Sequence, residues 1–496
     1  MRLPKEFMGI FDYLKRNAEL YPDKIGLIID GKHITYRELF KFVLNTISNL
    51  KKNNFSSKSV VLIIEDNTLS HILSLFALSY LNSTIVPVGE YYLKKHISKM
   101  ILTAKVNSII GNKLNCFYFV DKFKIKNVLC TEISKKFDYF FKESKTKISL
   151  NKKINIKKNF IITMSSGSTA EPKPIVFSQK TKIVRYKLFE KLYNLNKEDC
   201  IIVTSPIDHS LGMRTLFVPL LCAATCVVMK KFSVPEYCEL IKKYNVSFSV
   251  LVASQIYQLL ENKNYFNNFW LKKGLVSAST KLFSDAKNKI IKKKINLYEM
   301  YGAAEIGTVT SINISKDKKN YKSVGKTYDK NIKIKILSNN KFLKKNKIGE
   351  IVCKTPGKFK YYFNSKALNK NSFYKGFFKT GDVGYLDKKN YLYFLSRKKN
   401  IIRRSGITIF PEDIENIFLK DKKINQIAVV GKEEKLETKL FFYFEKNKFF
   451  NENYVKNICL KKLSTFQMPN KIIFLKKMPK TNLGKINKMK LVQYIN

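Results

Sequence analysis

Small and hydroxyl-bearing residues at positions 165–169 form the stretch whose types and order most directly indicate chemistry. Residues 160–164 before it are continuously apolar, which predicts a strand buried on both faces. A small-residue loop after a strand lets backbone N–H groups converge on an anion. The loop therefore predicts a polyphosphate-binding site, with a polar surface loop as the alternative. The residues that would donate are Ser165, Ser166, Gly167, Ser168, Thr169 and Lys173.

This loop is not a P-loop of the G-x-x-x-x-G-K-[ST] kind, because proline precedes Lys173 and no hydroxyl follows it. Other chemically suited residues follow predicted strands at 200–204, 247–252 and 275–279. Because the carboxyl ends of parallel strands meet at one edge of a sheet, they predict a single ligand crevice. The stretches in question include Pro206-x-x-His209-x-x-Gly212 and, further on, Tyr301-Gly302-Ala303-Ala304-Glu305. Two more stretches with chemically suited residues lie outside these strands, Thr380-Gly381-Asp382 and Pro479-x-Thr481-x-x-Gly484-Lys485.

Elements that could position these residues are readable along the chain. Predicted strands at 60–64 and 84–88 flank a helical pattern at 70–81, and this alternation predicts a covered, parallel sheet. Residues 320–395 change to short alternating segments separated by glycines, which predicts a smaller β-rich module. After Lys399 the pattern returns to mixed α and β. We therefore expect an α/β protein with domains at 1–398 and 399–496.

Composition limits the classes of partner. The 496 residues carry a net charge of +55, with 85 lysines and only 8 arginines distributed along the whole chain. Nucleic-acid binding favours clustered arginine or a localised basic tail, so we expect no specific nucleic-acid partner and interpret the bias as compositional. The excess charge should nevertheless attract polyanions.

Cysteine usage and hydropathy indicate a cytoplasmic protein. None of the 8 cysteines forms a Cys-x-x-Cys pair, which predicts reduced core residues. The N-terminal residues lack the apolar region of a signal peptide. The longest apolar stretch, 216–229, is too short to span a bilayer and predicts a buried helix end followed by a strand.

Taken together, these motifs resemble those of the adenylate-forming superfamily, which contains acyl- and aryl-CoA synthetases, adenylation domains and luciferases. The resemblance covers nearly the whole chain, from about residue 21 to residue 491, with the motifs in the family's order. Pro206-x-x-His209-x-x-Gly212 is similar to the acyl- and aryl-CoA ligase form. The resemblance implies a large N-terminal ATP- and acyl-binding domain and a small mobile C-terminal domain, with Lys399 at the hinge.

The resemblance also implies roles for individual residues. Tyr301 would stack on adenine, Asp382 and Arg397 would bind the ribose, and Glu305 would hold magnesium. Lys485 would offset charge at the α-phosphate, which makes Lys485 and Glu305 the catalytic residues. The implied ATP site comprises Ser165, Ser166, Gly167, Ser168, Thr169, Lys173, Tyr301, Gly302, Ala304, Asp382 and Arg397. The implied substrate and thiol site comprises His209, Gly212, Ala278, Ser279 and Gly406, with His209 expected in the cleft wall.

Some positions depart from the family pattern. Ala170 and Pro174 replace usual glycines of the phosphate loop, Ala304 replaces a threonine, and Ser405 replaces a frequent glycine. The small-Gly-Gly turn of the substrate tunnel is Ser277-Ala278-Ser279 here. Added side-chain volume would narrow that pocket, which favours a short, branched or aromatic acid.

The activity implied by the resemblance is ATP-dependent formation of an acyl-adenylate from a carboxylic acid, followed by thioester formation with CoA. The cofactors would be ATP, Mg²⁺ and CoA. One alternative is a stand-alone adenylation enzyme that loads a carrier protein, and Asp208 beside the motif leaves an amino-acid substrate open. A second alternative, motivated by Ala170, Pro174 and Ala304, is a degenerate member that binds nucleotide without turnover.

Overall fold

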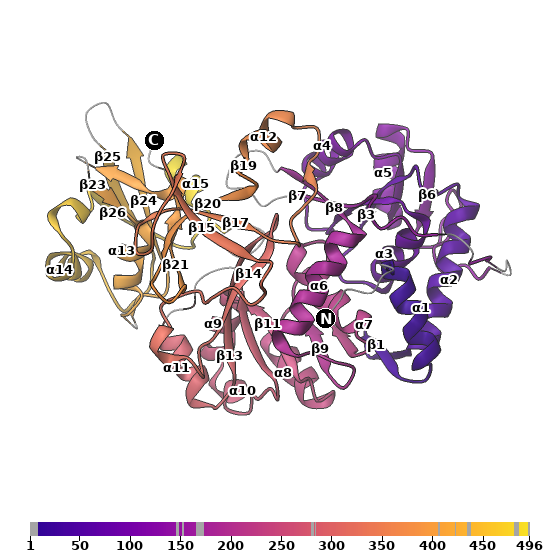
Figure 1. The fold of residues 1–496 in the computed structure, drawn as a ribbon, viewed down its shortest axis with the longest axis horizontal. Helices are drawn as coiled ribbons and strands as arrows, with labels where there is room; N and C mark the ends of the chain where they lie inside the picture. Colours follow the sequence, from indigo (N-terminus) through magenta and orange to yellow (C-terminus); the bar gives the residue numbers. More distant parts are fainter. Residues whose placement is uncertain are drawn as a thin grey trace.

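The structure is a computed structural model. It describes residues 8–144, 148–150, 153–164, 173–278, 282, 284–404, 407–421, 423–433, 438–480 and 486–494. Helices from the start of the chain lie at one end of the molecule and the C-terminal elements lie at the other (Figure 1). Two large sheets make up most of the N-terminal part.

The first large sheet has seven strands in the order β18-β8-β7-β4-β3-β5-β6. β3, β4, β5, β6 and β7 pair in parallel, as the predicted alternation of strands and helices requires. β7 and β8 pair antiparallel. The strands are β3 (Val60–Ile64), β4 (Thr84–Val88), β5 (Ser108–Gly111), β6 (Asn127–Cys130), β7 (Asn159–Met164), β8 (Pro174–Ser178) and β18 (Tyr361–Tyr362).

The second large sheet has eight strands in the order β14-β13-β12-β11-β9-β10-β1-β2. The strands from β13 to β1 in this order are parallel, and antiparallel strands flank both ends. They are β1 (Ile25–Ile29), β2 (Lys32–Thr35), β9 (Cys200–Val203), β10 (Thr225–Val228), β11 (Phe248–Val252), β12 (Gly274–Ala278), β13 (Leu297–Ala303) and β14 (Gly307–Asn313).

Helices cover both faces of both sheets. Along β3, Val61 and Ile63 join one hydrophobic cluster while Leu62 and Ile64 join another, so each face of the strand is buried. The largest cluster combines residues of both sheets with five helices, which places those helices between the sheets: α1 (Ile10–Leu20), α2 (Tyr36–Lys52), α3 (Leu69–Leu81), α6 (Gln179–Tyr193) and α7 (Ser210–Leu221).

The outer faces carry the remaining helices. α4 (Lys94–Ala104) and α5 (Lys113–Phe123) pack on the seven-stranded sheet. The eight-stranded sheet is covered by α8 (Val234–Lys243), α9 (Ala253–Glu261), α10 (Lys263–Asn267) and α11 (Ser284–Lys292). The predicted α/β class with covered, largely parallel sheets is confirmed.

The predicted β-rich part follows β14 and contains a six-stranded antiparallel sheet, which lies between the large sheets and the C-terminal elements (Figure 1). Its strands are β15 (Lys333–Ser338), β16 (Lys341–Phe342), β17 (Gly349–Lys354), β19 (Phe373–Tyr374), β20 (Phe377–Leu386) and β21 (Leu392–Arg397), with η1 (Lys318–Asn320) and α12 (Lys366–Asn371) beside them.

The C-terminal elements have cores of their own. Two hydrophobic clusters consist only of residues between Ile402 and Leu491. A separate core favours the predicted boundary near Lys399, which stays a prediction. The elements are η2 (Lys398–Asn400), β22 (Ile402–Arg404), β23 (Ile407–Ile409), α13 (Pro411–Phe418), β24 (Ile427–Glu433), β25 (Thr438–Glu445), α14 (Glu452–Lys462), η3 (Thr465–Gln467), β26 (Lys471–Leu475) and α15 (Lys488–Gln493).

Local predictions agree with these elements. The apolar stretch 216–229 is the end of α7 followed by β10, as predicted. All eight cysteines are free thiols. Among the described residues, no helix has both the length and the apolar character that a bilayer crossing requires.

Candidate active site

Part of the predicted site lies outside the described residues: Ser165, Ser166, Gly167, Ser168 and Thr169 of the loop, and also Ser279, Gly406 and Lys485. The two ends of the loop are nevertheless defined, because it joins the antiparallel neighbours β7 and β8. Met164 pairs with Pro174 across this hairpin. Pro174 is therefore the first residue of a strand, where proline is tolerated, rather than a member of the loop.

The first group of predicted residues surrounds the turn between β13 and β14. Glu305 lies in this turn, and its Oε1 accepts a hydrogen bond of 2.8 Å from the Tyr362 hydroxyl. Burial and the adjacent Glu305 charge raise the pKa of Tyr362, which keeps the hydroxyl protonated as the donor. The Lys173 ammonium lies 6.0 Å from the centroid of the Tyr362 ring. Tyr362 therefore brings Glu305 and Lys173 to one place.

Three cations gather on this side of the site. Burial, followed by repulsion from Arg397 and Lys173, lowers the pKa of Lys399. Lys399 is therefore near enough to Arg397 and Lys173 for their charges to act on it. A polyanion beside Lys399 would relieve the repulsion.

A second group joins Tyr301, Asp382 and Arg397. The Tyr301 hydroxyl donates to Asp382 Oδ2 at 2.6 Å, and Arg397 Nε lies 2.8 Å from Asp382 Oδ1. The Asp382 side chain is only 2% exposed, whereas that of Arg397 is 46% exposed. Burial and the Asp382 carboxylate raise the pKa of Tyr301. The structure thus brings together the residues predicted for adenine and ribose, with Arg397 as the exposed member.

The register of the strands explains this contact. Asp382 in β20 lies directly opposite Arg397 in β21, so the two side chains form a cross-strand pair. Gly381, which precedes Asp382, has a φ of 70°, a left-handed conformation that favours glycine. Tyr301 belongs to β13 of the eight-stranded sheet. The predicted ribose site is therefore assembled from two different sheets.

The acyl end of the site is organised around Asp208. Its Oδ2 accepts hydrogen bonds from the Tyr91 hydroxyl at 2.7 Å and from the Gly89 N–H at 3.2 Å. The same Tyr91 hydroxyl lies 2.9 Å from His209 Nε2. His209 also lies against the ring of Tyr92, with centroids 6.3 Å apart. His209 thus lies among these side chains, and its place in the wall of the cleft stays a prediction.

The other predicted residues of this end lie at the carboxyl edge of the eight-stranded sheet. Gly212 is in the first turn of α7, where a Cβ would lie 2.1 Å from the Pro206 carbonyl oxygen, so only glycine fits. Ala278 is the last residue of β12 and is buried. The ends of β9, β11, β12 and β13 meet at this edge, as predicted.

Several residues near the site belong to none of the motifs recognised in the sequence. They are Tyr91, Tyr362, Arg185 and Asn67. The Asn67 side-chain amide donates to the carbonyls of Ser205 and Met229 and so stabilises the segment before α7. Arg185 did leave a signal, since arginine is rare in a chain whose basic residues are almost all lysine. A retained arginine indicates a place that needs several donors in a fixed plane.

The carboxylate of Glu305 fits a magnesium ion bound with nucleotide. Mg²⁺ is held by one or two carboxylates together with substrate phosphates and water, rather than by an all-protein cage. Glu305 presents such a carboxylate, with one of its oxygens fixed by Tyr362 and with Lys173 near the ring of that tyrosine. Within the described residues, no group of three or more His, Cys, Asp or Glu is arranged to hold a metal.

Comparison with known proteins identifies the class. The model of the AMP-binding enzyme family matches residues 14–363, and that of the AMP-binding enzyme C-terminal domain matches residues 413–485. The chain belongs to the AMP-binding enzyme family. The predicted membership of the adenylate-forming superfamily is therefore confirmed.

Individual relatives cover almost the whole chain. A 2-succinylbenzoate–CoA ligase of Listeria innocua is 24% identical, over 97% of this chain and 98% of its own length. An indoleacetate–CoA ligase of Aromatoleum aromaticum is 21% identical, over 97% of each chain. The o-succinylbenzoate CoA synthetase of Bacillus subtilis, solved with its acyl-adenylate intermediate, has the same fold, with a TM-score of 0.88 at 20% identity over 97% of each chain.

Proposed function

We propose that this chain is a carboxylic acid–CoA ligase that works through an acyl-adenylate. The observation that carries the proposal is the Tyr301–Asp382–Arg397 cluster in a chain of the AMP-binding enzyme family, with Glu305 in the turn that follows the strand of Tyr301. A buried carboxylate at this position can accept hydrogen bonds from ribose hydroxyls once the exposed Arg397 side chain shifts. The cations beside Glu305 suit a triphosphate.

The reaction has two steps. A carboxylate oxygen of the acid attacks the α-phosphorus of ATP, and the bond to pyrophosphate breaks. The sulfur of CoA then attacks the acyl carbon, and the bond to AMP breaks while the thiol proton passes to solvent. Neither step needs a protein nucleophile, so catalysis consists of positioning and electrostatic stabilisation. Bound magnesium would neutralise part of the phosphate charge at Glu305.

In this proposal the cations of the chain oppose the charge that develops during the first step. Lys173 lies beside the triphosphate, Arg397 belongs to the ribose with Asp382, and Lys485 approaches the α-phosphate with the C-terminal domain. Lys399 is the hinge about which residues 399–496 rotate between the two steps. Gly406 and its neighbours then line the path of the CoA arm.

The acyl end favours a compact acid without an α-amine. Asp208 Oδ2 already accepts hydrogen bonds from Gly89 and Tyr91, and the side chain is only 3% exposed, which disfavours pairing with a substrate amino group. Ala278 occupies a buried position at the predicted pocket wall and adds volume there. Since the relatives named above act on aromatic acids, 2-succinylbenzoate and indoleacetate are the first acids to test.

The test is carboxylate-dependent ATP–pyrophosphate exchange with a panel of aromatic, short, branched and long-chain acids. We expect exchange with at least one compact acid, followed by CoA-dependent AMP release and a thioester detectable by mass. Transfer to a phosphopantetheinyl carrier protein without transfer to CoA would favour the adenylation-enzyme alternative. Nucleotide binding with no exchange on any acid would contradict the proposal and favour a degenerate member.

A further inference from the structure

Among the described residues, the hydrogen bonds of the buried Arg185 side chain go to backbone carbonyl groups. It lies on α6 and is 5% exposed. Its Nε donates to the Gly357 carbonyl at 2.6 Å, Nη1 to the Ala304 carbonyl at 2.9 Å and Nη2 to the Glu305 carbonyl at 2.7 Å. One planar group therefore fixes three carbonyls from two separate segments.

Among the described residues no carboxylate forms an ion pair with Arg185, although the Glu305 charge partly favours its protonated form. Burial, together with repulsion from Arg214, lowers the pKa of Arg185 to about 9. Lys182, one turn earlier on α6, is also buried, and its pKa is lowered by burial and by both arginines. Keeping cations together in this way costs folding free energy. A role in the site offers a reason for the cost.

The contacts of Arg185 are concentrated on the turn that carries Glu305. The Glu305 carbonyl also accepts a hydrogen bond of 2.7 Å from the Phe359 N–H. Gly357 allows the close approach, since a Cβ there would lie 2.9 Å from Arg185 Cγ. Arg185 and Phe359 thus hold the main-chain carbonyl of Glu305, and Tyr362 holds its side-chain carboxylate.

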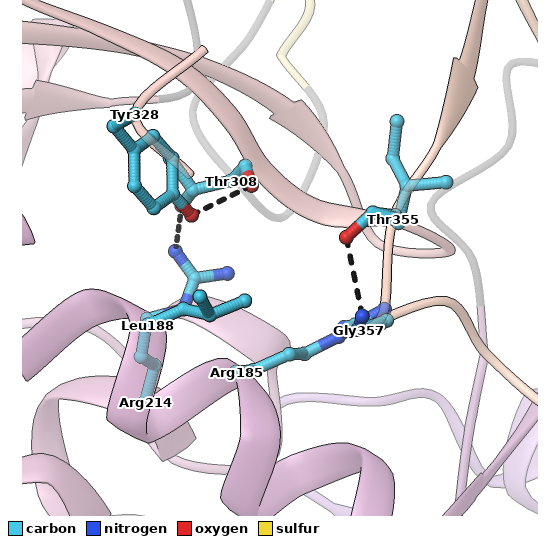
Figure 2. Close-up of a pocket in the computed structure, with 8 residues that line it drawn as sticks. Arg185, Leu188, Arg214, Thr308, Tyr328, Thr355 and Gly357 are labelled. Atoms are coloured by element: carbon cyan, nitrogen blue, oxygen red, sulfur yellow. Dashed lines mark hydrogen bonds between the residues drawn. The ribbon is translucent and has the colours of Figure 1, made fainter. Parts of the chain in front are cut away.

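Figure 2 shows how Arg185 differs from Arg214, which lies across the same small cavity of about 10 Å³, room for about one water molecule. Arg214 Nη1 donates to the Thr308 hydroxyl on β14 at 2.8 Å, beyond the turn. Arg185 instead comes from the helix that directly follows β8, the strand after the phosphate loop. Arg185 therefore connects α6 to the turn that contains Glu305.

We propose that Arg185 is a positioning residue that holds the Ala304–Glu305 turn so that the Glu305 carboxylate can bind metal–nucleotide. The inference rests on the proposed function. Lysine cannot replace the planar fork, because its single ammonium cannot reach all three carbonyls in one geometry. Residues that orient a metal ligand typically change metal affinity about 10- to 100-fold when they are replaced.

The experiment measures binding of Mn²⁺ in the presence of a non-hydrolysable ATP analogue, by electron paramagnetic resonance, without any acid substrate. We expect Arg185→Met to weaken Mn²⁺ binding about tenfold or more and Arg185→Lys to weaken it less. Arg16→Met is the matched control, because Arg16 donates to the Leu221 carbonyl, at 3.3 Å, away from Glu305. The control should bind Mn²⁺ as the unaltered chain does.

A double-mutant cycle separates positioning from general destabilisation. If Arg185 acts through Glu305, Arg185→Met should change Mn²⁺ binding by less than about twofold in a Glu305→Gln background. Equal weakening in both backgrounds, or unaltered binding by Arg185→Met, would overturn the inference. Thermal unfolding reports whether Arg185→Met folds; if it does not, Arg185→Lys decides through the same cycle. An unaltered chain that binds Mn²⁺ with the analogue but exchanges pyrophosphate with no acid contradicts the proposed function alone.

Discussion

Positive charge exceeds negative charge at the nucleotide end of the candidate site, whereas the acyl end holds one buried carboxylate among neutral donors. At the nucleotide end, Lys173 and Arg397 lie close enough to Lys399 to lower its pKa. At the acyl end, Asp208 receives hydrogen bonds from Gly89 and Tyr91. The proposed nucleotide end therefore suits a polyanion, whereas Asp208 Oδ2 at the proposed acyl end already accepts two hydrogen bonds.

This difference indicates what each end selects. Charge complementarity recognises a triphosphate whatever acid is being activated. A preformed wall of side chains selects by shape and by the polar groups it leaves unpaired. Substitutions at the nucleotide end should therefore affect every acid equally, while substitutions at the acyl end should discriminate between acids.

The strongest test of this comparison is Asp382→Asn. The amide keeps the shape but loses the charge that pairs with Arg397 and accepts ribose hydroxyls, so ATP–pyrophosphate exchange should fall about 100-fold or more. The loss should be the same for every acid. Asp387→Asn, in the turn after β20, is the control and should keep the exchange rate. A loss that depends on the acid would contradict the separation of the two ends.

An intermediate effect is expected for Tyr91→Phe, which removes one of the donors to Asp208 and the contact with His209. Leaving a buried acceptor short of a donor costs about 1–3 kcal/mol, so kcat/KM for the acid should fall about tenfold. KM for ATP should stay unchanged. Tyr265→Phe on α10 is matched in exposure, at 40% for both tyrosines, and should have no effect. An equal change in the KM for the acid and the KM for ATP would contradict the separation of the two ends.

The smallest effect concerns Lys182, which is buried on α6 near Arg185 and Arg214. Burial places the folded-state pKa of Lys182 below its unfolded-state value. The unfolded chain therefore binds more protons between the two pKa values, and the free energy of unfolding rises with pH up to about 10.4. Lys182→Met removes this cost and should stabilise the chain by about 1 kcal/mol at pH 7.

Urea unfolding at pH 7 and pH 9.5 measures this effect. The gain in the free energy of unfolding from Lys182→Met should be smaller at pH 9.5. At that pH the unfolded-state pKa of Lys182 is closer, so keeping this side chain neutral in the folded state costs less free energy. Lys41→Met, at an exposed position of α2, should show no such pH dependence. A constant difference at both pH values would mean that packing, not charge, accounts for the change.

Most of the fold could be predicted from local patterns. The Asp30–Gly31 turn is a hairpin with positive φ at both residues, and the Thr35 hydroxyl and the Glu38 carboxylate form a capping box. Continuously apolar strands such as β3 indicated sheets covered on both faces. These features depend on neighbours in the chain, so the sequence carries them directly. The prediction that Pro174 belongs to the loop was wrong, because Pro174 pairs with Met164 as the first residue of β8. Where a loop ends depends on the neighbouring strand with which its last residues pair.

The sequence by itself determined the class of chemistry, through the order of the stretches around Tyr301, Glu305, Asp382 and Arg397. It could not show that Asp382 would meet Tyr301, which lies in a different sheet. Nor could it show that Arg185 reaches the turn of Glu305, since 120 residues separate them and the packing of α6 alone brings them together. Local sequence selects the groups, and long-range packing decides which of them touch, because burial rewards contacts between distant segments.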